Sequence, residues 1–501
     1  MGVLNKINHI VVLMLENRSF DNLLGGLGQF YPPAMNFNGL TGNEANPNPP
    51  GPPVQVWSNV GSDRATMTIP DPDPGEDWIY MNQQLCANQT YSPPAPAVAM
   101  SGFVANYLFQ KTLPNNTGLT YDPRAVMHYF TPDQVPVLSA LARAFAVSDA
   151  WFASAPCQTW PNRFFVHCAT ANGYENNEPV HFPYEMETIF NRMESAGQPW
   201  KIYFTDFPQS LTLSNLWLHL DHFDLYDHLR SDVAADKLPA YSFIEPRYFP
   251  DFRLPNDEHP PHDVRLGEQL IYDVYNCLRT GPRWSETLLV ITCDEHGGCY
   301  DHVLPPAAPP PAPPRPGQAF AFDRFGVRVP AVIVSPYIPA GTILRAPPGS
   351  QPFDHTAIIR TLRDRFNLGA PLTQRDVNAP SLDLALALSV PSNGGPPHID
   401  VSTYTPTFPE IARAQLDDLN DFQHSLMVAA AHLPTDAAMA AVQAHIAGLK
   451  TGLLTQSVED VEAHVAKLGT ALGVADGSDG VAREDARHFV KQRLNQLFGS
   501  L

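Results

Sequence analysis

The chain contains six short runs in which almost every position is apolar, instead of every second one. These runs are residues 9–15, 145–148, 201–204, 241–244, 288–293 and 329–335. A strand with one face in water alternates apolar and polar residues, whereas a strand of a parallel sheet covered on both faces is apolar throughout. The six runs therefore predict strands of one mostly parallel sheet with helices on both sides.

Between and after these runs, apolar residues recur at helical spacing. The predicted helices are residues 135–145, 186–197, 264–281 and 355–369. The third of them ends in Arg279 and Gly281, which is a typical helix stop. Strands that alternate with helices indicate an α/β fold, in which the sheet forms the middle layer of an α/β/α sandwich.

The pattern changes near residue 400. From Glu410 to the end the chain is rich in Ala, Leu, Gln and charged residues at helical spacing, with few strand-like runs. We expect residues 1–400 to form the α/β domain and residues 401–501 to form a helical region. That region would pack on the domain or form an interface, including the interface of a homo-oligomer.

The charge balance excludes one class of partner. The 501 residues carry a formal net charge of −20 and only 16% charged residues, below the ~25% typical of soluble domains. A nucleic-acid surface needs clustered Lys and Arg, so we expect no nucleic acid as partner. No run of ~20 apolar residues is present, so we also expect no integral membrane segment.

The first apolar run begins at residue 9, which leaves no space for the charged start, apolar core and cleavage site of a signal peptide. We therefore expect a cytoplasmic protein as the sequence stands, and a secreted or periplasmic one if a leader was removed. The six cysteines have no CxxC spacing, which favours free, buried thiols over a zinc site built from them.

Polar side chains with oxygen or imidazole groups follow four of the predicted strands. Glu16 and Asn17 follow the first, "TWPNRF" comes after residues 145–148, "NDEHPPHD" after 241–244, and Asp294 with Glu295 after 288–293. A polar residue at one strand end is usually only a cap. In an open α/β sheet, however, ligands bind at the carboxyl ends of the strands, so four such ends together predict a site.

The segment "TWPNRF" has the pattern of a helix start that binds phosphate. Pro161 suits the first turn of a helix, and Thr159 stands near its N-cap, where free N–H groups favour an anion. A simple capping threonine is the alternative reading. A threonine hydroxyl becomes a nucleophile only when a base or a metal deprotonates it. We assign Asn162, in the same segment, to substrate binding.

The predicted metal ligands are Glu16, Asn17, Thr159, Asp294 and Glu295. Their oxygen atoms suit one hard divalent cation, so Ca²⁺, Mg²⁺ or Mn²⁺ is favoured, and Zn²⁺ or Fe is the alternative. Neighbouring strand residues point to opposite faces, so the backbone must turn for both acids after residue 293 to reach one ion. The glycines at 297 and 298 permit such a turn.

Two histidines near these acids are candidates for catalysis. His259, in the loop after residues 241–244, and His302, after the second acidic pair, could contact phosphoryl oxygens or protonate a leaving group. A histidine taken alone is more often structural, and that alternative stays open for both.

At this point the residues resemble a known family. The segments, in chain order over about residues 8–368, are "HIVVLMLENRSFDNLLG", "TWPNRFF", "LPAYSFIEPRYF", "DEHPPHDVRLGEQLI" and "WSETLLVITCDEHGGCYDHVLPP". They are similar to the phosphoesterase family of non-specific phospholipases C and AcpA-type acid phosphatases, within the alkaline-phosphatase superfamily. The resemblance implies an alkaline-phosphatase-like α/β/α core and hydrolysis of phosphate esters through a phosphoryl-enzyme intermediate.

Position by position, the resemblance implies roles that agree with the motifs. Glu16 and Asn17 match the family's first metal-binding pair, Asp294 and Glu295 its second, and Thr159 its nucleophile. The histidine at 259 matches one that contacts the phosphoryl group, and the one at 302 belongs to a recurrent Asp-His pair. Cysteines at 157, 293 and 299 depart from the family pattern. We therefore expect the lining of the pocket to differ from that of the family, whereas the metal ligands are unchanged.

The resemblance implies a phosphoric ester hydrolase. Patterns such as "DEHPPHDV" and "DEHGG" favour a phospholipase C that cleaves phospholipid phosphodiesters through a phosphothreonine, with an acid phosphatase acting on monoesters as the alternative. A sulfatase is disfavoured, because "TWPNR" has Thr where that chemistry needs Cys or Ser. A scaffold protein without turnover is disfavoured by the intact set of ligands.

Overall fold

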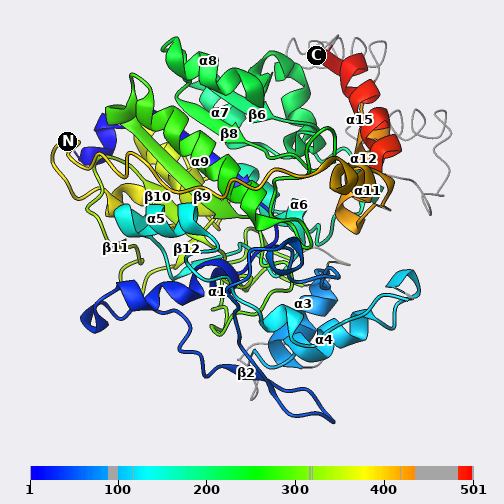
Figure 1. Cartoon of the computed structure of the whole chain (residues 1–501). Coiled ribbons are helices and arrows are strands. Elements are labelled where there is room, and N and C mark those ends of the chain that lie inside the picture. The colour runs from blue at the N-terminus through cyan, green and yellow to red at the C-terminus, as the bar shows by residue number, and fades with distance from the viewer. Residues whose placement is uncertain are drawn as a thin grey trace.

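The computed structural model describes residues 2–87, 100–116, 118–314, 318, 320–417, 419–434 and 483–498. All six predicted strands are present and belong to one eight-stranded sheet (Figure 1). In spatial order the sheet consists of β11 (Thr342–Ile343), β4 (Ala146–Val147), β10 (Ala331–Val334), β9 (Thr287–Cys293), β1 (His9–Leu15), β8 (Tyr241–Ile244), β6 (Trp200–Phe204) and β7 (Phe223–Leu225).

The sheet is mostly parallel, as predicted, with one strand reversed. β1 lies in the centre and pairs in parallel with β9 on one side and β8 on the other. β10 runs antiparallel to both of its neighbours, β9 and β4. Parallel neighbours need a crossover connection, usually a helix, and the described part of residues 294–330 contains no α-helix.

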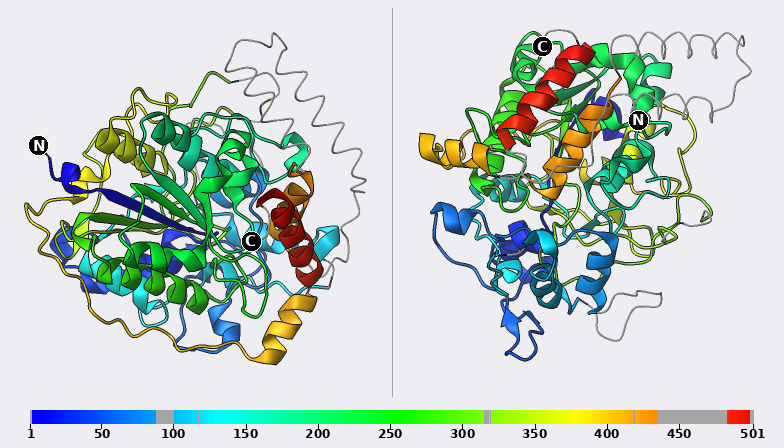
Figure 2. Two further views of the ribbon diagram at one scale, coloured as in Figure 1. Left: turned by 90° about the horizontal axis from the view of Figure 1, so that it is seen from above. Right: turned by 90° about the vertical axis from the view of Figure 1, so that its right-hand side faces the viewer.

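Helices cover both faces of the sheet, which confirms the predicted α/β class (Figures 1 and 2). α5 (Pro136–Ala144), α8 (Leu229–Ala234) and α9 (Val264–Thr280) pack in one layer, and α6 (Thr159–Cys168), α7 (Ile189–Ser195) and α10 (Thr356–Phe366) in the other. All seven residues of β9 are buried. Each large aliphatic side chain so buried contributes roughly 1.5–3 kcal/mol.

A second apolar cluster lies beside the carboxyl edge of the sheet. It includes residues of α3 (Trp78–Cys86) and α4 (Phe103–Gln110), such as Leu85 and Tyr107. The long segment between α1 (Phe20–Leu24) and α3 includes a two-stranded ribbon of β2 (Ala45–Asn46) and β3 (Val54–Gln55). This excursion brings residues 73–76 to the same edge of the sheet as the ends of β1 and β9.

Three described helices follow residue 401: α11 (Phe408–Leu416), α12 (Asp421–His432) and α15 (Arg483–Phe498). α12 packs against α15, and Phe498 stacks on Phe204 of β6. The described part of the region is therefore helical, whereas residues 435–482 lie outside the described residues. The division into two domains and an oligomer through these helices stay predictions. Within the described chain, no helix is both long and apolar enough to cross a membrane.

Candidate active site

The register of the central strands brings the first two acids together. β1 and β9 are parallel neighbours, with Leu15 opposite Cys293, so Glu16 and Asp294 leave the sheet side by side. The Asn17 N–H donates to Asp294 Oδ1 (3.1 Å), and Asn17 has a left-handed φ of 54° that turns the chain sharply. The predicted meeting of the two strand ends is therefore present.

The turn after β9 depends on glycine, as the sequence predicts. Gly297 and Gly298 have φ values of 59° and 63°, which side chains rarely adopt. A Cβ atom at Gly297 would lie 2.0 Å from the Asn17 carbonyl oxygen, so no larger residue fits there. The turn lets Glu295 Oε2 accept the Gly297 N–H (2.8 Å), while Glu295 Oε1 is buried without a hydrogen-bond partner.

Thr159 is the first residue of α6 and points at the end of β1. Its hydroxyl Oγ1 lies 3.1 Å from Glu16 Oε2 and 3.2 Å from Asn17 Oδ1. We name Glu16, Asn17, Thr159, Asp294 and Glu295 together the acidic site. None of the five has solvent-exposed surface. Strand ends and a helix start that are far apart in sequence thus form one buried cluster.

The start of α6 offers fewer N–H groups than the sequence suggests. The Trp160 N–H donates to Asn177 Oδ1 (2.8 Å), and Pro161 has no N–H. Of the first three residues of the helix, only Thr159 therefore retains an N–H that could meet a phosphoryl oxygen. The helix dipole still favours an anion at this point.

The structure places Asn162 in the first turn of α6, where its side chain faces the loop before Thr159. Its Oδ1 accepts the Ala155 N–H (3.0 Å), and its Nδ2 donates to the carbonyls of Cys157 (2.7 Å) and Gln158 (3.1 Å). The amide thus holds the loop that leads into α6. These bonds already use the groups that would contact a ligand, so they do not support the assignment of Asn162 to substrate binding. That assignment stays a prediction.

Arg163 is a site residue that the sequence reasoning missed. One turn after Thr159, its Nη2 lies 2.6 Å from Glu16 Oε1, and its Nε 3.1 Å from Asp294 Oδ2. Burial lowers the pKa of the guanidinium, but Glu16 and Asp294 outweigh burial and raise the pKa. The spacing of four residues from Thr159 could have indicated it, because such residues share one face of a helix.

Two acids of the excursion before α3 were also missed. Glu76 Oε1 accepts a hydrogen bond from Asn17 Nδ2 (2.6 Å) and lies 3.7 Å from His259 Nε2. Asp73 Oδ2 lies 3.8 Å from His259 Nδ1. Nothing in the local sequence pattern marks these acids, because the excursion reaches the site only through tertiary packing.

His259 is buried beside the acidic site as a neutral ring. Its Nδ1 lies 2.6 Å from the Pro260 carbonyl oxygen, which can only accept, so Nδ1 carries the hydrogen and Nε2 the lone pair. Burial lowers the pKa of His259 to about 4. Nε2 is buried without a hydrogen-bond partner, and Phe422 of α12 stacks on the ring. The ring is placed to accept a proton at Nε2.

His302 lies in a different cluster. Its Nδ1 is 2.6 Å from Asp21 Oδ2, and its Nε2 is 3.0 Å from Asn38 Oδ1. Arg328 donates to both Asp21 (3.0 Å) and Asp301 (2.9 Å). Among the described residues, no contact joins His302 to the nucleophile. Both ring nitrogens of His302 are used in contacts that hold the loops together. A catalytic role of His302 stays a prediction, and no described contact supports it.

The acidic site has more negative groups than its neighbours neutralise. Burial raises the pKa values of Glu16, Glu76 and Glu295, and nearby acids raise all three further, while Arg163 lowers only that of Glu16. An uncompensated buried carboxylate is costly, so such a cluster needs either protons or a cation. The unpartnered Glu295 Oε1 and the amide and hydroxyl oxygens around it form the donor set that a hard divalent ion prefers.

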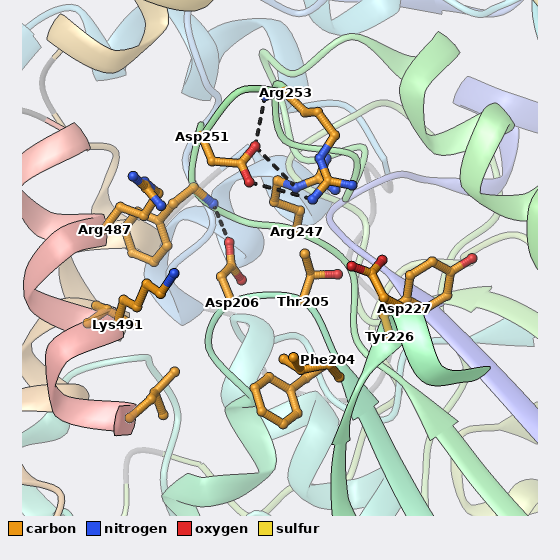
Figure 3. A pocket seen from close by; sticks show the side chains of 14 residues that line it. Phe204, Thr205, Asp206, Tyr226, Asp227, Arg247, Asp251, Arg253, Arg487 and Lys491 are labelled. Carbon is orange, nitrogen blue, oxygen red and sulfur yellow. Dashed lines mark hydrogen bonds and ion pairs between the residues drawn. The ribbon is translucent and has the colours of Figure 1, made fainter. Parts of the chain in front are cut away.

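A cavity of about 180 Å³ lies elsewhere, between the end of β6 and α15 (Figure 3). Arg247 and Arg253 line it from the loop after β8, and Arg487 and Lys491 line it from α15. No member of the acidic site lines this cavity. It is therefore a separate feature of the surface that the C-terminal helix helps to form.

Fold and site together describe an α/β protein with a buried cluster of oxygen ligands around a helix-start hydroxyl, and the comparisons name its family. The phosphoesterase family model matches residues 7–369, and the chain belongs to this family. It is 38% identical over 452 residues to non-specific phospholipase C6 of Arabidopsis thaliana, covering 86% of this chain and 81% of that protein. It is 37% identical to non-specific phospholipase C3 of the same plant, covering 86% and 83%. Phospholipase C B of Mycobacterium tuberculosis is 28% identical, covering 80% and 81%.

Proposed function

We propose that the chain is a phospholipase C that cleaves the phosphodiester of a phospholipid through a phosphothreonine at residue 159. The observation that carries this proposal is the Thr159 hydroxyl at the start of α6, 3.1 Å from Glu16 Oε2 and 3.2 Å from Asn17 Oδ1. The plant and mycobacterial relatives, which are named phospholipases C, support the choice of a phospholipid as substrate.

The acidic site would hold one divalent metal ion through Glu16, Asn17, Thr159, Asp294 and Glu295. Ca²⁺, Mg²⁺ or Mn²⁺ fits this oxygen set best. When bound, such an ion lowers the pKa of the threonine hydroxyl and offsets the negative charge of the phosphoryl group. All remaining tasks fall to side chains of the chain itself.

In the first step the Thr159 oxygen bonds to phosphorus while the bond from phosphorus to the glycerol oxygen breaks. The proton lost by the Thr159 hydroxyl ends on the departing diacylglycerol oxygen, and the head group stays on the phosphothreonine. In the second step water attacks the phosphothreonine, which releases the phosphorylated head-group alcohol and restores the hydroxyl. The neutral His259 ring, with Nε2 as acceptor, would take the proton of that water. Glu76, 3.7 Å away, would then stabilise the charged ring.

Arg163 would position both halves of the acidic site. Its guanidinium joins Glu16 from β1 to Asp294 from β9 while it lies on the same helix as the nucleophile. Gln209 also donates to Glu16 Oε1 (2.7 Å) and fixes the same carboxylate from another side. Such bonds keep the ligand oxygens in place before substrate arrives, which is the usual role of groups behind a metal ligand.

One experiment separates the phospholipase from an acid phosphatase with the same nucleophile. Hydrolysis of phosphatidylcholine, p-nitrophenylphosphorylcholine and p-nitrophenyl phosphate is measured on one preparation with its metal content. A phospholipase C hydrolyses the two diesters faster than the monoester, and quenched reactions with the diesters contain phosphorylcholine on the peptide of Thr159. Faster hydrolysis of the monoester would support the phosphatase instead, and phosphate on another residue would refute the proposed nucleophile.

A further inference from the structure

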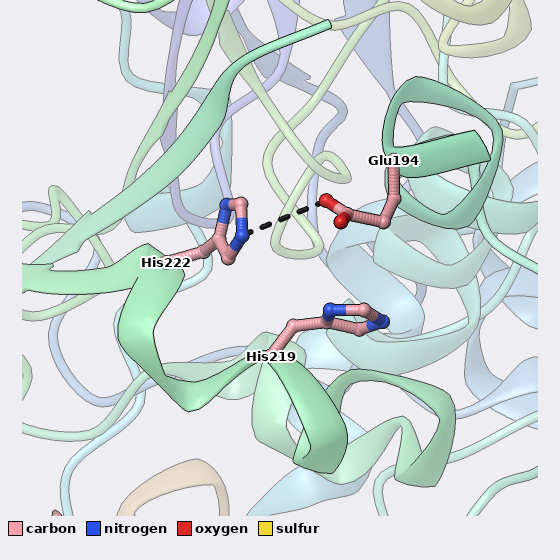
Figure 4. Close-up of side chains that lie close together, drawn as sticks. All are labelled: Glu194, His219 and His222. Atoms are coloured by element: carbon pink, nitrogen blue, oxygen red, sulfur yellow. Dashed lines mark ion pairs between the residues drawn. The ribbon is translucent and has the colours of Figure 1, made fainter. Parts of the chain in front are cut away.

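A cluster of two histidines and a glutamate lies at the opposite edge of the sheet from the acidic site. Glu194 belongs to α7, and His219 and His222 belong to the 3₁₀ segment η8 (Ser214–His222). One ligand atom from each of the three side chains lies within 4.8 Å of the other two, and Figure 4 shows the side chains converging. Trp200, which organises the cluster, is the first residue of β6, whereas the acidic site follows the last residues of β1 and β9.

Trp200 fixes two of the three side chains. The His222 Nδ1 lies 2.8 Å from the Trp200 carbonyl oxygen, so Nδ1 carries a hydrogen, and in the neutral ring that binds a metal Nε2 holds the lone pair. The Trp200 indole N–H donates to Glu194 Oε2 (3.2 Å), and the His222 ring stacks on the indole with centroids 4.0 Å apart. A metal-binding histidine is typically oriented by this kind of bond from its other nitrogen to a carbonyl.

Two acceptor atoms therefore face one another. His222 Nε2 and Glu194 Oε2 lie 3.6 Å apart, which is too long for a hydrogen bond between them. Two ligands of one tetrahedral zinc ion lie roughly 3.3 Å apart, given bonds of about 2.0–2.1 Å. The pair already has almost this spacing, and a ligand atom of His219 lies within 4.8 Å of both.

We propose that Glu194, His219 and His222 form a second metal site, which binds a divalent transition-metal ion of the zinc type. Imidazole and carboxylate ligands select Zn²⁺ and its neighbours in the periodic table over Mg²⁺ or Ca²⁺. The site is reachable from solvent, because the Glu194 and His222 side chains are 44% and 21% exposed. Bound metal would fasten the end of α7 to η8 across the start of β6.

The test uses Zn²⁺ added to chelator-treated protein, with stoichiometry and affinity measured by calorimetry. The wild type is expected to bind one Zn²⁺ equivalent that Glu194→Gln weakens at least about tenfold and His219→Asn with His222→Asn removes. Glu194→Gln keeps the shape of the side chain, so it remains informative if the double variant is unstable. Hydrolysis of p-nitrophenylphosphorylcholine should stay within about twofold of wild type in all of these variants.

Two controls separate this site from its alternatives. His398→Asn removes an exposed histidine 3.0 Å from Asp400, a pair with only two ligands, and should leave the Zn²⁺ equivalent unchanged. Asp294→Asn should also leave it unchanged, so the second site is tested independently of the proposed phospholipase. Equal Zn²⁺ binding by wild type and the double histidine variant would overturn the proposal, as would loss of this equivalent in Asp294→Asn alone.

Discussion

Two groups of buried carboxylates lie at the carboxyl edge of the same sheet, and they differ in how their charge is balanced. The balanced cluster consists of Asp21, Asp301, His302 and Arg328. Its Arg328 donates to both carboxylates and also to the backbone carbonyls of residues 38 and 149. Each of its acids thus has a cationic partner within the protein.

The acidic site has no such balance. Arg163 contacts two of its acids, but Glu295 Oε1 is buried without a hydrogen bond, and Glu76 adds a further carboxylate beside it. A buried charge without a partner costs several kcal/mol, so the second group is stable only with a proton or a cation. The comparison shows that two groups of similar acids differ in charge balance, and this difference is why we propose the metal at the acidic site.

The largest effect is expected from the nucleophile. Thr159→Ala should lower turnover by about 10³-fold or more, because in the proposed mechanism the Thr159 hydroxyl forms the covalent intermediate. The melting temperature should stay close to that of wild type, which differential scanning calorimetry would measure.

The control is Thr361→Ala, which removes another buried threonine hydroxyl, one that donates to the Ala357 carbonyl in α10. It should keep near-normal turnover. Substantial hydrolysis by Thr159→Ala would contradict the assignment of the nucleophile.

The next prediction compares one acid from each group. Asp294→Asn should lower bound metal and reduce turnover by about 10–100-fold, because the amide is a weaker ligand and also disturbs Arg163. Asp301→Asn should leave metal content unchanged. Elemental analysis of both variants checks this, and equal loss of metal in the two would erase the proposed distinction between the groups.

The two arginines extend the comparison to stability. Arg328→Met leaves two buried carboxylates without their cation and should cost about 3–5 kcal/mol in the free energy of unfolding. Its turnover per folded molecule should stay within a few-fold of wild type. Arg163→Met should lower turnover strongly as well, since it loosens Glu16 and Asp294. Urea unfolding and activity at matched folded fractions would show whether the two variants differ as expected.

The last prediction concerns a buried acid for which the described residues supply no cationic partner, and its effect on stability per pH unit is the smallest of the set. Glu268 accepts the N–H groups of Val137 and Leu138 at the start of α5, and burial raises its pKa to about 8. The folded protein therefore holds this proton more tightly than the unfolded chain. Between about pH 4.5 and 8 this group lowers stability as pH rises, by at most about 1.4 kcal/mol per pH unit.

Glu268→Gln should remove this contribution, so its stability should depend less on pH over the same range. Unfolding midpoints in urea at several pH values measure the slope. Identical slopes in variant and wild type would show that Glu268 does not titrate in this range.

The sequence predicted the sheet well, and it also predicted that the residues after β1 and β9 lie near the start of α6; that these residues bind a metal stays a prediction. The apolar runs marked strands to within two residues at each end, since burial on both faces demands continuous hydrophobicity. Parallel strands end at one edge, so the residues that follow β1 and β9 had to lie together. Contacts between Thr159 and Glu16, 143 residues apart, follow from that rule and from the position of α6.

Other site residues could not be predicted in this way. Glu76 reaches Asn17 from an irregular excursion, and His302 joins Asp21 although it stands only seven residues after Glu295. Neither position obeys a periodicity, because loops are shaped by packing against the rest of the molecule. The antiparallel direction of β10 was not predicted either, because the path of the irregular segment before it depends on the same tertiary packing.

By itself, the sequence determined the layers of the fold and which oxygen-bearing side chains follow the strands, because hydrophobic periodicity and the order of residues are local properties. Only the tertiary structure decided which charges are balanced and which are not. Arg328 and Arg163 are the same residue type, yet their surroundings differ. Packing pairs Arg328 with both acids of its cluster, whereas Arg163 contacts two acids and leaves Glu295 Oε1 without a hydrogen bond. Charge balance depends on distances between remote segments, and no stretch of sequence contains those distances.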